Sequence, residues 1–159
     1  MPTWALTWNP EVFNWERHGL RSDLQQFAGC GYLEADWSCG WTHATRPDGP
    51  KKGDRFFLFR VGRNRPGLLG SGHFLSRPGK GSGTFKRMPT ARIWFDYLAD
   101  YRSQKQYLSR DTLVLLTGDR LSYPASGMPV APATAGHLEL LVGMIRASRS
   151  RANAREEHD

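Results

Sequence analysis

The segment that begins at Trp37 joins a large flat ring to small polar neighbours. Ser38, Cys39 and Gly40 follow the ring directly, and a second tryptophan is Trp41. An indole is a stacking surface for a planar ligand, and the adjacent hydroxyl and backbone amides can bond the ligand's edge. A nucleobase extruded from its strand needs both kinds of contact, and stacking contributes roughly 1–3 kcal/mol. Core packing is the alternative for each tryptophan, and we expect it for Trp4, Trp15 and Trp94.

The sequence offers no set of residues from which a catalytic site can be assembled. None of the five histidines has another His, Cys or carboxylate at metal-ligand spacing, and there is no nucleophile elbow, Walker loop or dinucleotide fingerprint. Asp54 and Asp119 adjoin turn glycines, and turn formation accounts for them. Cys30 and Cys39 match no common zinc spacing and are expected to be reduced structural thiols. We therefore expect a non-catalytic protein without cofactor or metal.

The charge of the chain favours a polyanionic partner. There are 22 Lys and Arg against 15 Asp and Glu, a formal net charge of +7. Between residues 77 and 92 basic residues occur without an acid. Phosphate contacts supply much of the affinity for nucleic acid, so this stretch is the predicted backbone-binding segment. Its predicted phosphate-binding residues are Lys80, Lys86, Arg87 and Arg92. A merely soluble basic surface is the alternative on charge alone.

The length and hydropathy of the chain suit one soluble domain. Its 159 residues, 39% hydrophobic, can bury a core. No apolar run approaches the roughly 20 residues that span a bilayer, and the N-terminus does not resemble a signal peptide. We expect a cytoplasmic protein with no membrane partner, a domain over residues 1–147, and a polar, Arg-rich tail or linker over residues 148–159.

Strands are expected where aromatic and aliphatic residues are bounded by turn residues. The segment 55–62 is apolar on both faces, as in a strand buried on two sides, and a Pro/Gly turn joins it to the next strand as a hairpin. In that second strand Gly70 and Gly72 predict a bend, a bulge or a close approach of backbones. The predicted strands cover residues 3–8, 32–38, 55–62, 68–76 and 92–98.

Helices are expected in three places. The chain from the Asn9-Pro10 turn to Gly31 has a helical pattern, and Asn14 or Ser22 is its candidate cap. Ser109 caps a short helix through Leu116, and Pro132 opens the final helix. Helices with these few strands suit a small curved sheet or open barrel with helices packed outside.

Five motifs in order resemble those of the EVE domains of the PUA-like superfamily. They are W-x-x-x-W-N-P from Trp4, W-S-C-G from Trp37, K-G-D-R-F-F-L-F-R-V-G from Lys52, G-L-L-G-S-G-H-F-L-S from Gly67, and L-S-Y-P-A-S-G-M-P-V from Leu121. The order is most similar to the subgroup that precedes HNH nuclease domains in prokaryotic modification-dependent restriction proteins. The resemblance spans residues 4–145.

The resemblance implies an α+β fold, a curved mixed β-pseudo-barrel of five or six strands flanked by helices and related to the YTH fold. Such domains take modified bases, among them 5-methylcytosine, 5-hydroxymethylcytosine and N6-methyladenine, into a pocket. In YTH-like relatives the segment matching Trp37–Cys39 forms one wall of that pocket, and the segment after the first strand, here Trp8 and Asn9, borders it. Further carried-over positions are Ser71, Gly72, Ser126 and Gly127.

The sequence departs from the family at several points. Residues 77–92 match no family pattern, so Phe85 and Trp94 are only candidates for a second cage aromatic. Thr42 and His43 stand where relatives often carry Asn or basic residues, which leaves the preferred base open. No HNH motif follows, so this is either a stand-alone reader or a protein whose nuclease comes from a partner subunit or a further domain.

The predicted function is recognition of a modified, flipped DNA base, methylated or hydroxymethylated cytosine, by a targeting domain of a restriction or defence system. Trp37 stacks on the base, Ser38, Cys39 and Asn9 contact its edge, and Trp8 or Trp41 closes the other face. DNA is favoured over RNA. The alternatives are a PUA-like module for modified RNA or transfer RNA, and a domain that senses a small ligand. The sequence leaves the oligomeric state open.

Overall fold

The computed structural model describes residues 2–17, 19–39, 47–79, 89–102, 107–124 and 126–158. The longer strands are β1 (Thr3–Trp8), β2 (Leu33–Ser38), β3 (Arg55–Arg60), β4 (Gly67–Phe74) and β5 (Thr90–Leu98). Two short strands are β6 (Leu108–Ser109) and β7 (Met128–Pro129). The helices are α1 (Leu20–Cys30), α2 (Arg110–Thr117) and α3 (Pro132–Glu156).

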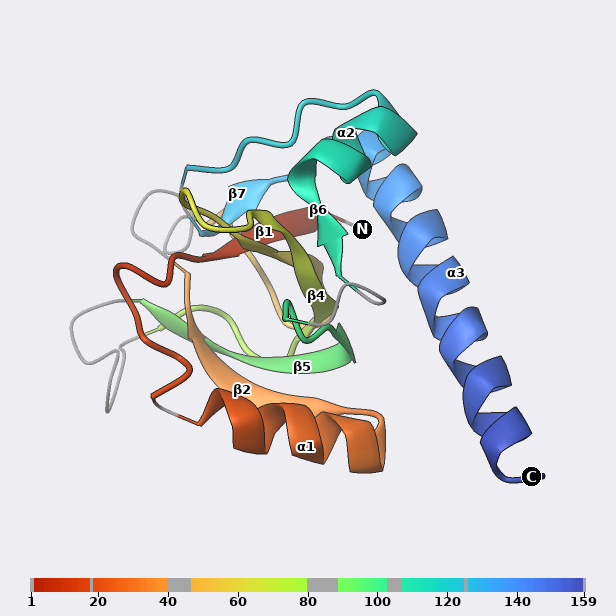
Figure 1. Cartoon of the computed structure of the whole chain (residues 1–159). Helices are drawn as coiled ribbons and strands as arrows, with labels where there is room; N and C mark the ends of the chain where they lie inside the picture. Colours follow the sequence, from red (N-terminus) through yellow and green to blue (C-terminus); the bar gives the residue numbers. More distant parts are fainter. Residues whose placement is uncertain are drawn as a thin grey trace.

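The strands of the described ranges form one curled, unclosed sheet. Its order is β2-β5-β4-β3-β1-β7, and β6 pairs with β4 beside this path. β1 and β3 are parallel, and the other pairs are antiparallel. Figure 1 shows α1 beneath β2, α2 at the opposite end, and the long α3 along one side. The α+β fold class is therefore confirmed. The seven strands exceed the expected five or six because β6 and β7, of two residues each, are too short to leave a pattern in the sequence.

Apolar side chains pack in two clusters, one on each face of the sheet. The α1-side core takes Leu6, Phe56 and Leu58 from the strands together with Leu20 and Phe27 of α1. The α3-side core packs the other face of the same strands against α2 and α3, with Ala5, Phe57, Phe59, Leu138 and Val142. Because β3 contributes to both cores, its expected burial on two sides is confirmed.

Glycines of β4 let neighbouring strands approach closely. A Cβ built on Gly72 would lie 1.8 Å from the carbonyl oxygen of Trp94 on β5, and one on Gly70 would lie 2.8 Å from that of Tyr97. The register shifts between Ser71 and Gly72 against β5, and between Leu58 and Phe59 against β4. Such bulges bend a sheet, which confirms the expectation drawn from these glycines.

The helices differ from the sequence prediction at their ends. The helix expected after residue 10 begins only at Leu20, where Gly19 in the left-handed region (φ 108°) precedes it without a side-chain cap. Ser22 lies inside α1, and the Asn14 Oδ1 atom accepts a hydrogen bond from the Arg17 N–H in an earlier turn. Several turns replace the expected first half of this helix, because Asn9 and Asn14 bond the local backbone.

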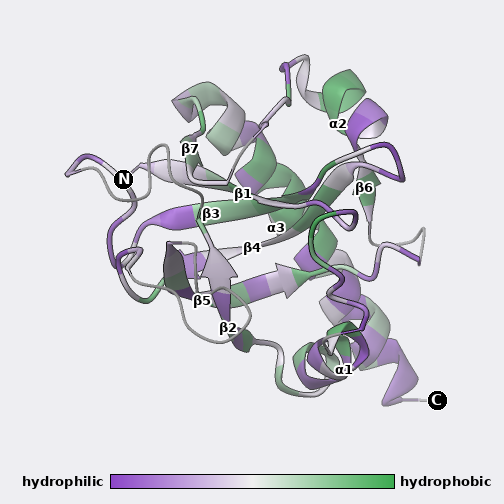
Figure 2. Ribbon diagram, turned by 90° about the vertical axis from the view of Figure 1, so that its left-hand side faces the viewer, coloured by the Kyte–Doolittle hydropathy of each residue, from purple (hydrophilic) through white to green (hydrophobic). Residues whose placement is uncertain are grey.

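The predicted start of α2 and α3 is confirmed. Ser109 caps α2 by accepting a hydrogen bond from the Thr112 N–H at 3.3 Å, and Pro132 opens α3. α3 continues to Glu156, so residues 148–156 are helical and not frayed. Figure 2 shows these last turns in the hydrophilic colour. None of the described helices combines the length and apolar character needed to cross a membrane.

The substitution Gly72→Ala is expected to lower the free energy of unfolding by about 3 kcal/mol or more, because the new methyl group would collide with the backbone of β5. Gly29→Ala is the matched control, since nothing lies within 4 Å of the added Cβ in α1. Alanine is favoured over glycine in a helix by roughly 0.5–1 kcal/mol, so this variant should be slightly more stable. Chemical denaturation of both variants measures the difference, and equal stabilities would contradict the close approach.

Candidate nucleic-acid interface

Trp37 lies in the α1-side core. Its side chain is 5% exposed, and its ring packs edge-on against Trp15 (5.0 Å between centroids) and Phe95 (6.5 Å). Its indole N–H donates to the Thr7 carbonyl at 3.3 Å. Trp37 is therefore buried against Trp15, from the turns before α1, and not open as the sequence suggested; its stacking on a base stays a prediction.

Trp8 and Asn9 also have structural contacts. Trp8 is 2% exposed, and its indole N–H donates to the Phe13 carbonyl at 2.8 Å. The Asn9 Oδ1 atom accepts a hydrogen bond from the Glu11 N–H at 3.0 Å, which closes a turn. A Cβ on Gly62 would lie 3.2 Å from the same oxygen. Through these contacts the end of β1 packs against the residues that follow β3.

Ser38 and Cys39 end β2 beside the start of β5. Ser38 is half-buried, and its backbone pairs with Thr90. Cys39 is fully buried, and its N–H donates to the Pro89 carbonyl at 2.8 Å. Burial raises the pKa of the Cys39 thiol to about 12. Cys39 is therefore a neutral core thiol.

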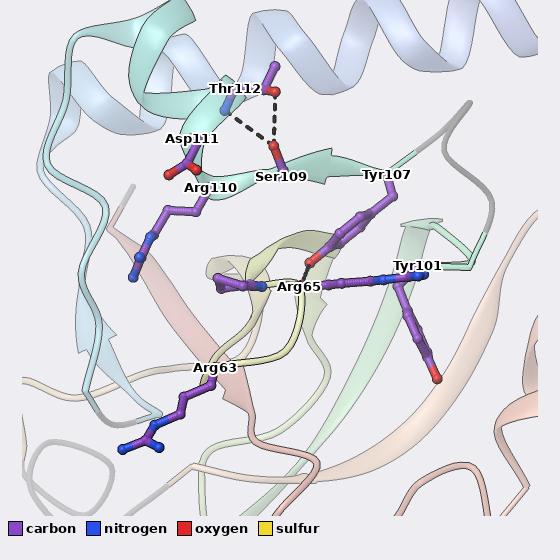
Figure 3. A pocket seen from close by; sticks show the side chains of 9 residues that line it. Arg63, Arg65, Tyr101, Tyr107, Ser109, Arg110, Asp111 and Thr112 are labelled. Atoms are coloured by element: carbon purple, nitrogen blue, oxygen red, sulfur yellow. Dashed lines mark hydrogen bonds between the residues drawn. The ribbon is translucent and has the colours of Figure 1, made fainter.

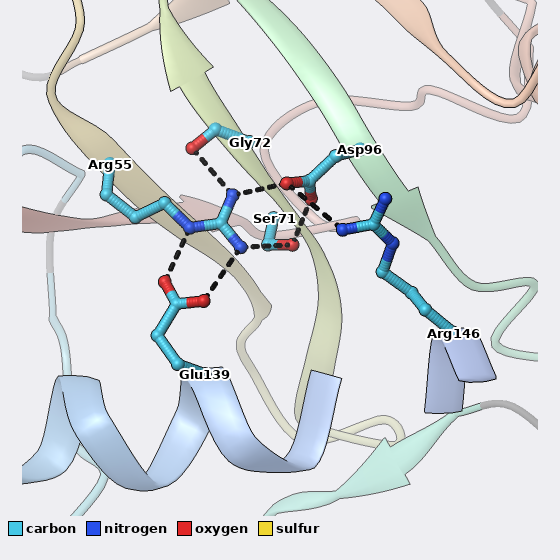
Figure 4. Close-up of polar contacts among 6 residues, drawn as sticks. All are labelled: Arg55, Ser71, Gly72, Asp96, Glu139 and Arg146. Carbon is cyan, nitrogen blue, oxygen red and sulfur yellow. Dashed lines mark hydrogen bonds and ion pairs between the residues drawn. The ribbon is translucent and has the colours of Figure 1, made fainter. Parts of the chain in front are cut away.

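Ser71 faces the opposite side of the sheet from Trp37. Its hydroxyl donates to Asp96 at 2.6 Å and accepts from Arg55 at 3.2 Å. Figure 4 shows these three residues in a network that Glu139 and Arg146 of α3 complete, with Arg55 2.6 Å from Glu139 and 2.7 Å from Asp96. Ser71 therefore takes part in a polar network on the α3 side of the sheet, and its place in a base pocket stays a prediction.

Ser126 joins its loop to β1. Its hydroxyl accepts a hydrogen bond from the Thr7 N–H at 2.7 Å and lies 3.1 Å from the Thr7 hydroxyl. The side chain is buried, so its role in this structure is to hold the loop before β7 in place.

The predicted phosphate-binding residues are mostly outside the described residues. Lys80, Lys86 and Arg87 lie there, as do the candidates Trp41 and Phe85. Arg92 is described: its exposed side chain pairs with Glu34 at 2.9 Å and Asp36 at 3.7 Å, so two carboxylates already compensate its charge. Trp94 stacks on Tyr32 at 6.2 Å on the surface of β5.

The two cysteines should differ sharply in reactivity, because the thiolate is the reactive form and Cys39 is buried with a raised pKa, whereas Cys30 is exposed. A thiol reagent at pH 8 is expected to modify one cysteine per native molecule quickly, and the second only after unfolding. In a Cys30→Ser variant the fast phase should vanish. Rapid modification of both thiols would show that the end of β2 is open to solvent.

A basic cavity of about 660 Å³ lies where the β3–β4 connection meets the start of α2. Figure 3 shows its side chains. Its charged and aromatic lining consists of Arg63, Arg65, Arg110, Asp111, Tyr101 and Tyr107. Among the described residues, none of the three arginines forms an ion pair. Three exposed guanidinium groups against one carboxylate give the cavity a positive potential.

Local structure holds this basic cavity together. The Arg110 N–H donates to the Pro66 carbonyl at 2.8 Å, which attaches the start of α2 to the β3–β4 connection. The Tyr107 hydroxyl donates to the Arg65 carbonyl, and Arg65 takes the left-handed conformation (φ 50°) at this point. Burial raises the pKa of Tyr107 to about 12, so its hydroxyl stays protonated and can donate.

Arg60 lies behind this cavity, at the end of β3. Its guanidinium carbon is 3.8 Å from the ring centroid of Tyr101 and 5.1 Å from that of Trp8. Trp8 contacts Trp15 at 5.4 Å, and Trp15 contacts Trp37. Ring contacts therefore run from Trp37 through Trp15 and Trp8 to Tyr101, which lines the cavity.

Sequence reasoning missed the residues of the basic cavity. Arg63 and Arg65 looked like ordinary turn residues, and Arg110 is far from them in the sequence. The pairing of β6 with β4 brings these segments together. Two arginines in one hairpin turn were the available signal. Within the described ranges no three His, Cys, Asp or Glu side chains gather as a metal site would require.

Comparison with known proteins identifies the fold. No family model and no curated protein sequence matches the chain. Protein PSPTO5229 from Pseudomonas syringae matches with a TM-score of 0.52 and 18% identity over 87% of this chain and 98% of that one. The Mmi1 YTH domain in complex with RNA matches with a TM-score of 0.53 and 11% identity over 93% and 81%. Human THYN1 in complex with 5-methylcytosine-containing DNA matches with a TM-score of 0.52 and 14% identity over 91% and 98%.

Identities this low show the fold alone. The chain therefore has the PUA-like fold of YTH domains and of THYN1, as its motifs predicted. Membership of the HNH-associated subgroup stays a prediction.

Proposed function

We propose that this protein is a non-catalytic module that binds nucleic acid and recognises one modified base. The observation that carries the proposal is the basic cavity, which combines three arginines without ion-pair partners among the described residues and two tyrosines. Two proteins with the same fold support it, since their structures contain RNA or 5-methylcytosine DNA.

The arginines of the basic cavity suit the phosphate backbone. Arg63 and Arg65 project from the β3–β4 connection, and Arg110 projects from the first turn of α2. Their charges can therefore contact a nucleic-acid strand from two sides. Backbone phosphates carry the charge that such groups bind, and release of counterions makes the binding depend on salt. Lys80, Lys86 and Arg87 lie outside the described residues and stay proposed phosphate contacts.

The base is proposed to enter the cavity itself. Its volume lies within the roughly 300–1,000 Å³ typical of small-ligand pockets. Tyr101 and Tyr107 supply aromatic surface there, and the ring of Trp8 supports Tyr101 from behind at 5.9 Å. Stacking on such rings favours an extruded base over one that stays in its helix.

The ligand we favour is methylated or hydroxymethylated cytosine in DNA, and modified RNA is the second candidate. This choice rests on the motif resemblance and on the THYN1 complex. In a restriction or defence system the module would direct a nuclease, supplied by a partner or a further domain, to modified DNA.

Replacing Arg63, Arg65 and Arg110 together by glutamine should weaken binding to every DNA sequence and reduce the dependence of the binding constant on salt. The slope of log K against log salt is expected to fall by about one for each phosphate that an arginine no longer neutralises. Fluorescence anisotropy at several salt concentrations measures this slope.

Arg21→Gln is the control for this charge change. Arg21 is exposed on α1, at the end of the molecule opposite α2 (Figure 1). Its replacement should leave the slope nearly unchanged. If the triple variant and Arg21→Gln behave alike, the basic cavity is not the interface.

Modified-base recognition predicts that oligonucleotides with 5-methylcytosine or 5-hydroxymethylcytosine bind more tightly than unmodified ones. One added methyl group packed against apolar surface, here the tyrosine rings, contributes at most about 1–3 kcal/mol, so we expect selectivity of up to roughly 10- to 200-fold. Competition between matched DNA and RNA strands decides which nucleic acid is preferred. Equal affinity for modified and unmodified strands would remove modified-base recognition while leaving nucleic-acid binding intact.

Two aromatic variants, tested for binding to modified and unmodified oligonucleotides, show which ring contacts the base. Tyr101→Leu should reduce the selectivity, because it removes a ring of the cavity. Trp37→Phe should retain it, since Trp37 is a core ring. Loss of selectivity in Trp37→Phe, with an unchanged melting temperature, would restore the stacking role that the sequence suggested for Trp37.

A further inference from the structure

Arg60 is a buried charged residue whose hydrogen-bonding groups are not satisfied. The residue is 3% exposed, and its Nε and Nη1 atoms have no hydrogen-bond partner among the described residues. Buried donors in folded proteins are nearly always bonded, so orphaned ones point to a missing partner.

The surroundings of Arg60 stabilise its charge only in part. The rings of Tyr101 and Trp8 attract the cation through their faces, which contributes about 0.5–2 kcal/mol for such contacts in general. Burial lowers the pKa of Arg60 overall; Tyr107 and Glu16 act to raise it, and the positive charge of Arg65 acts to lower it. No described carboxylate forms an ion pair with Arg60.

The position of Arg60 links it to the basic cavity. Its guanidinium lies on the ring of Tyr101, and that ring lines the cavity. Arg60 also lines a smaller neighbouring cavity of about 190 Å³, which shares Pro66 and Arg110 with the larger one. A ligand group that enters between these cavities comes within reach of a fourth arginine.

We propose that Arg60 is an anion-binding residue that takes a phosphoryl group of the ligand on its free N–H groups. A phosphoryl oxygen accepts hydrogen bonds and brings the negative charge that a buried guanidinium lacks. The neutral edge of a base would bond the N–H groups but leave the charge uncompensated. This inference rests on the proposed function, so the phosphoryl group is taken to belong to the bound nucleic-acid strand. Free inorganic phosphate has the same chemistry and is the other possible source.

The variant Arg60→Met tests this role, because methionine keeps much of the packing volume but removes the donors and the charge. We expect its melting temperature to equal or exceed that of the wild-type protein, since an unpaired buried charge is removed. Affinity for the oligonucleotide should fall roughly 10- to 100-fold, the range for loss of hydrogen bonds to a charged group. Arg60→Lys keeps the charge with fewer, differently placed donors and should give an intermediate affinity.

Inorganic phosphate distinguishes the two sources of the phosphoryl group. At constant ionic strength, replacing chloride by phosphate should raise the melting temperature of the wild-type protein and not that of Arg60→Met. If phosphate raises the melting temperature of the wild-type protein but Arg60→Met binds the oligonucleotide as tightly as the wild-type protein does, Arg60 binds free phosphate. That result would overturn the proposal that Arg60 binds a phosphoryl group of the nucleic-acid strand.

The outcomes also separate this inference from the proposed function. If Arg60→Met and Arg60→Lys bind the oligonucleotide and phosphate as the wild-type protein does, while the cavity triple variant loses affinity, the role of Arg60 is overturned and nucleic-acid binding stands. A large drop in melting temperature in both Arg60 variants, with the affinity of the folded fraction unchanged, would show a structural role and also overturn it. If no variant changes binding, both proposals fail.

Discussion

The contact of the Arg60 guanidinium with the rings of Tyr101 and Trp8 connects the core of this protein to its surface. β1 and β3 run parallel, and their last paired residues are Trp8 and Arg60. Through Trp15 the rings continue to Trp37 and to α1, where the Trp15 indole N–H donates to Asp23 at 2.8 Å. Tyr101 in the wall of the basic cavity is therefore packed against the core behind it, and preorganisation of this kind reduces the cost of binding.

The two faces of the sheet handle buried charge differently. On the α3 side, Arg55 is surrounded by Asp96, Glu139, Ser71 and the Gly72 carbonyl, so its donors are satisfied (Figure 4). On the other face, Arg60 has aromatic rings where Arg55 has carboxylates. A satisfied network holds α3 in place, whereas the buried Nε and Nη1 donors of Arg60 have no partner among the described residues. This contrast within one sheet is why we propose a binding role for Arg60 and not for Arg55.

The basic cavity depends on contacts between segments that are distant in the chain. The hairpin turn after β3 supplies two arginines, and the first turn of α2 supplies the third. Backbone hydrogen bonding of Arg110 to Pro66 fixes their distance, and the Ser109 cap fixes the direction of α2. Proteins with a similar fold include the Mmi1 YTH domain in complex with RNA and human THYN1 in complex with DNA, but fold alone does not fix function.

Local patterns were sufficient for the five longer strands and for the starts of α2 and α3, but not for β6, β7 or the start of α1. The two-sided apolar run of β3, the glycines of β4, the Ser109 cap and Pro132 each act through near neighbours, and each was predicted correctly. Residue types also indicated a basic protein and core positions for Trp4 and Trp15. Exposure of a given ring could not be predicted, because it depends on which distant side chain packs against it: Trp15 covers Trp37, and β4 turns Ser71 to the other face. The meeting of Arg63, Arg65 and Arg110 likewise arises only when β6 pairs with β4, a contact between segments far apart in the chain that no short sequence pattern encodes.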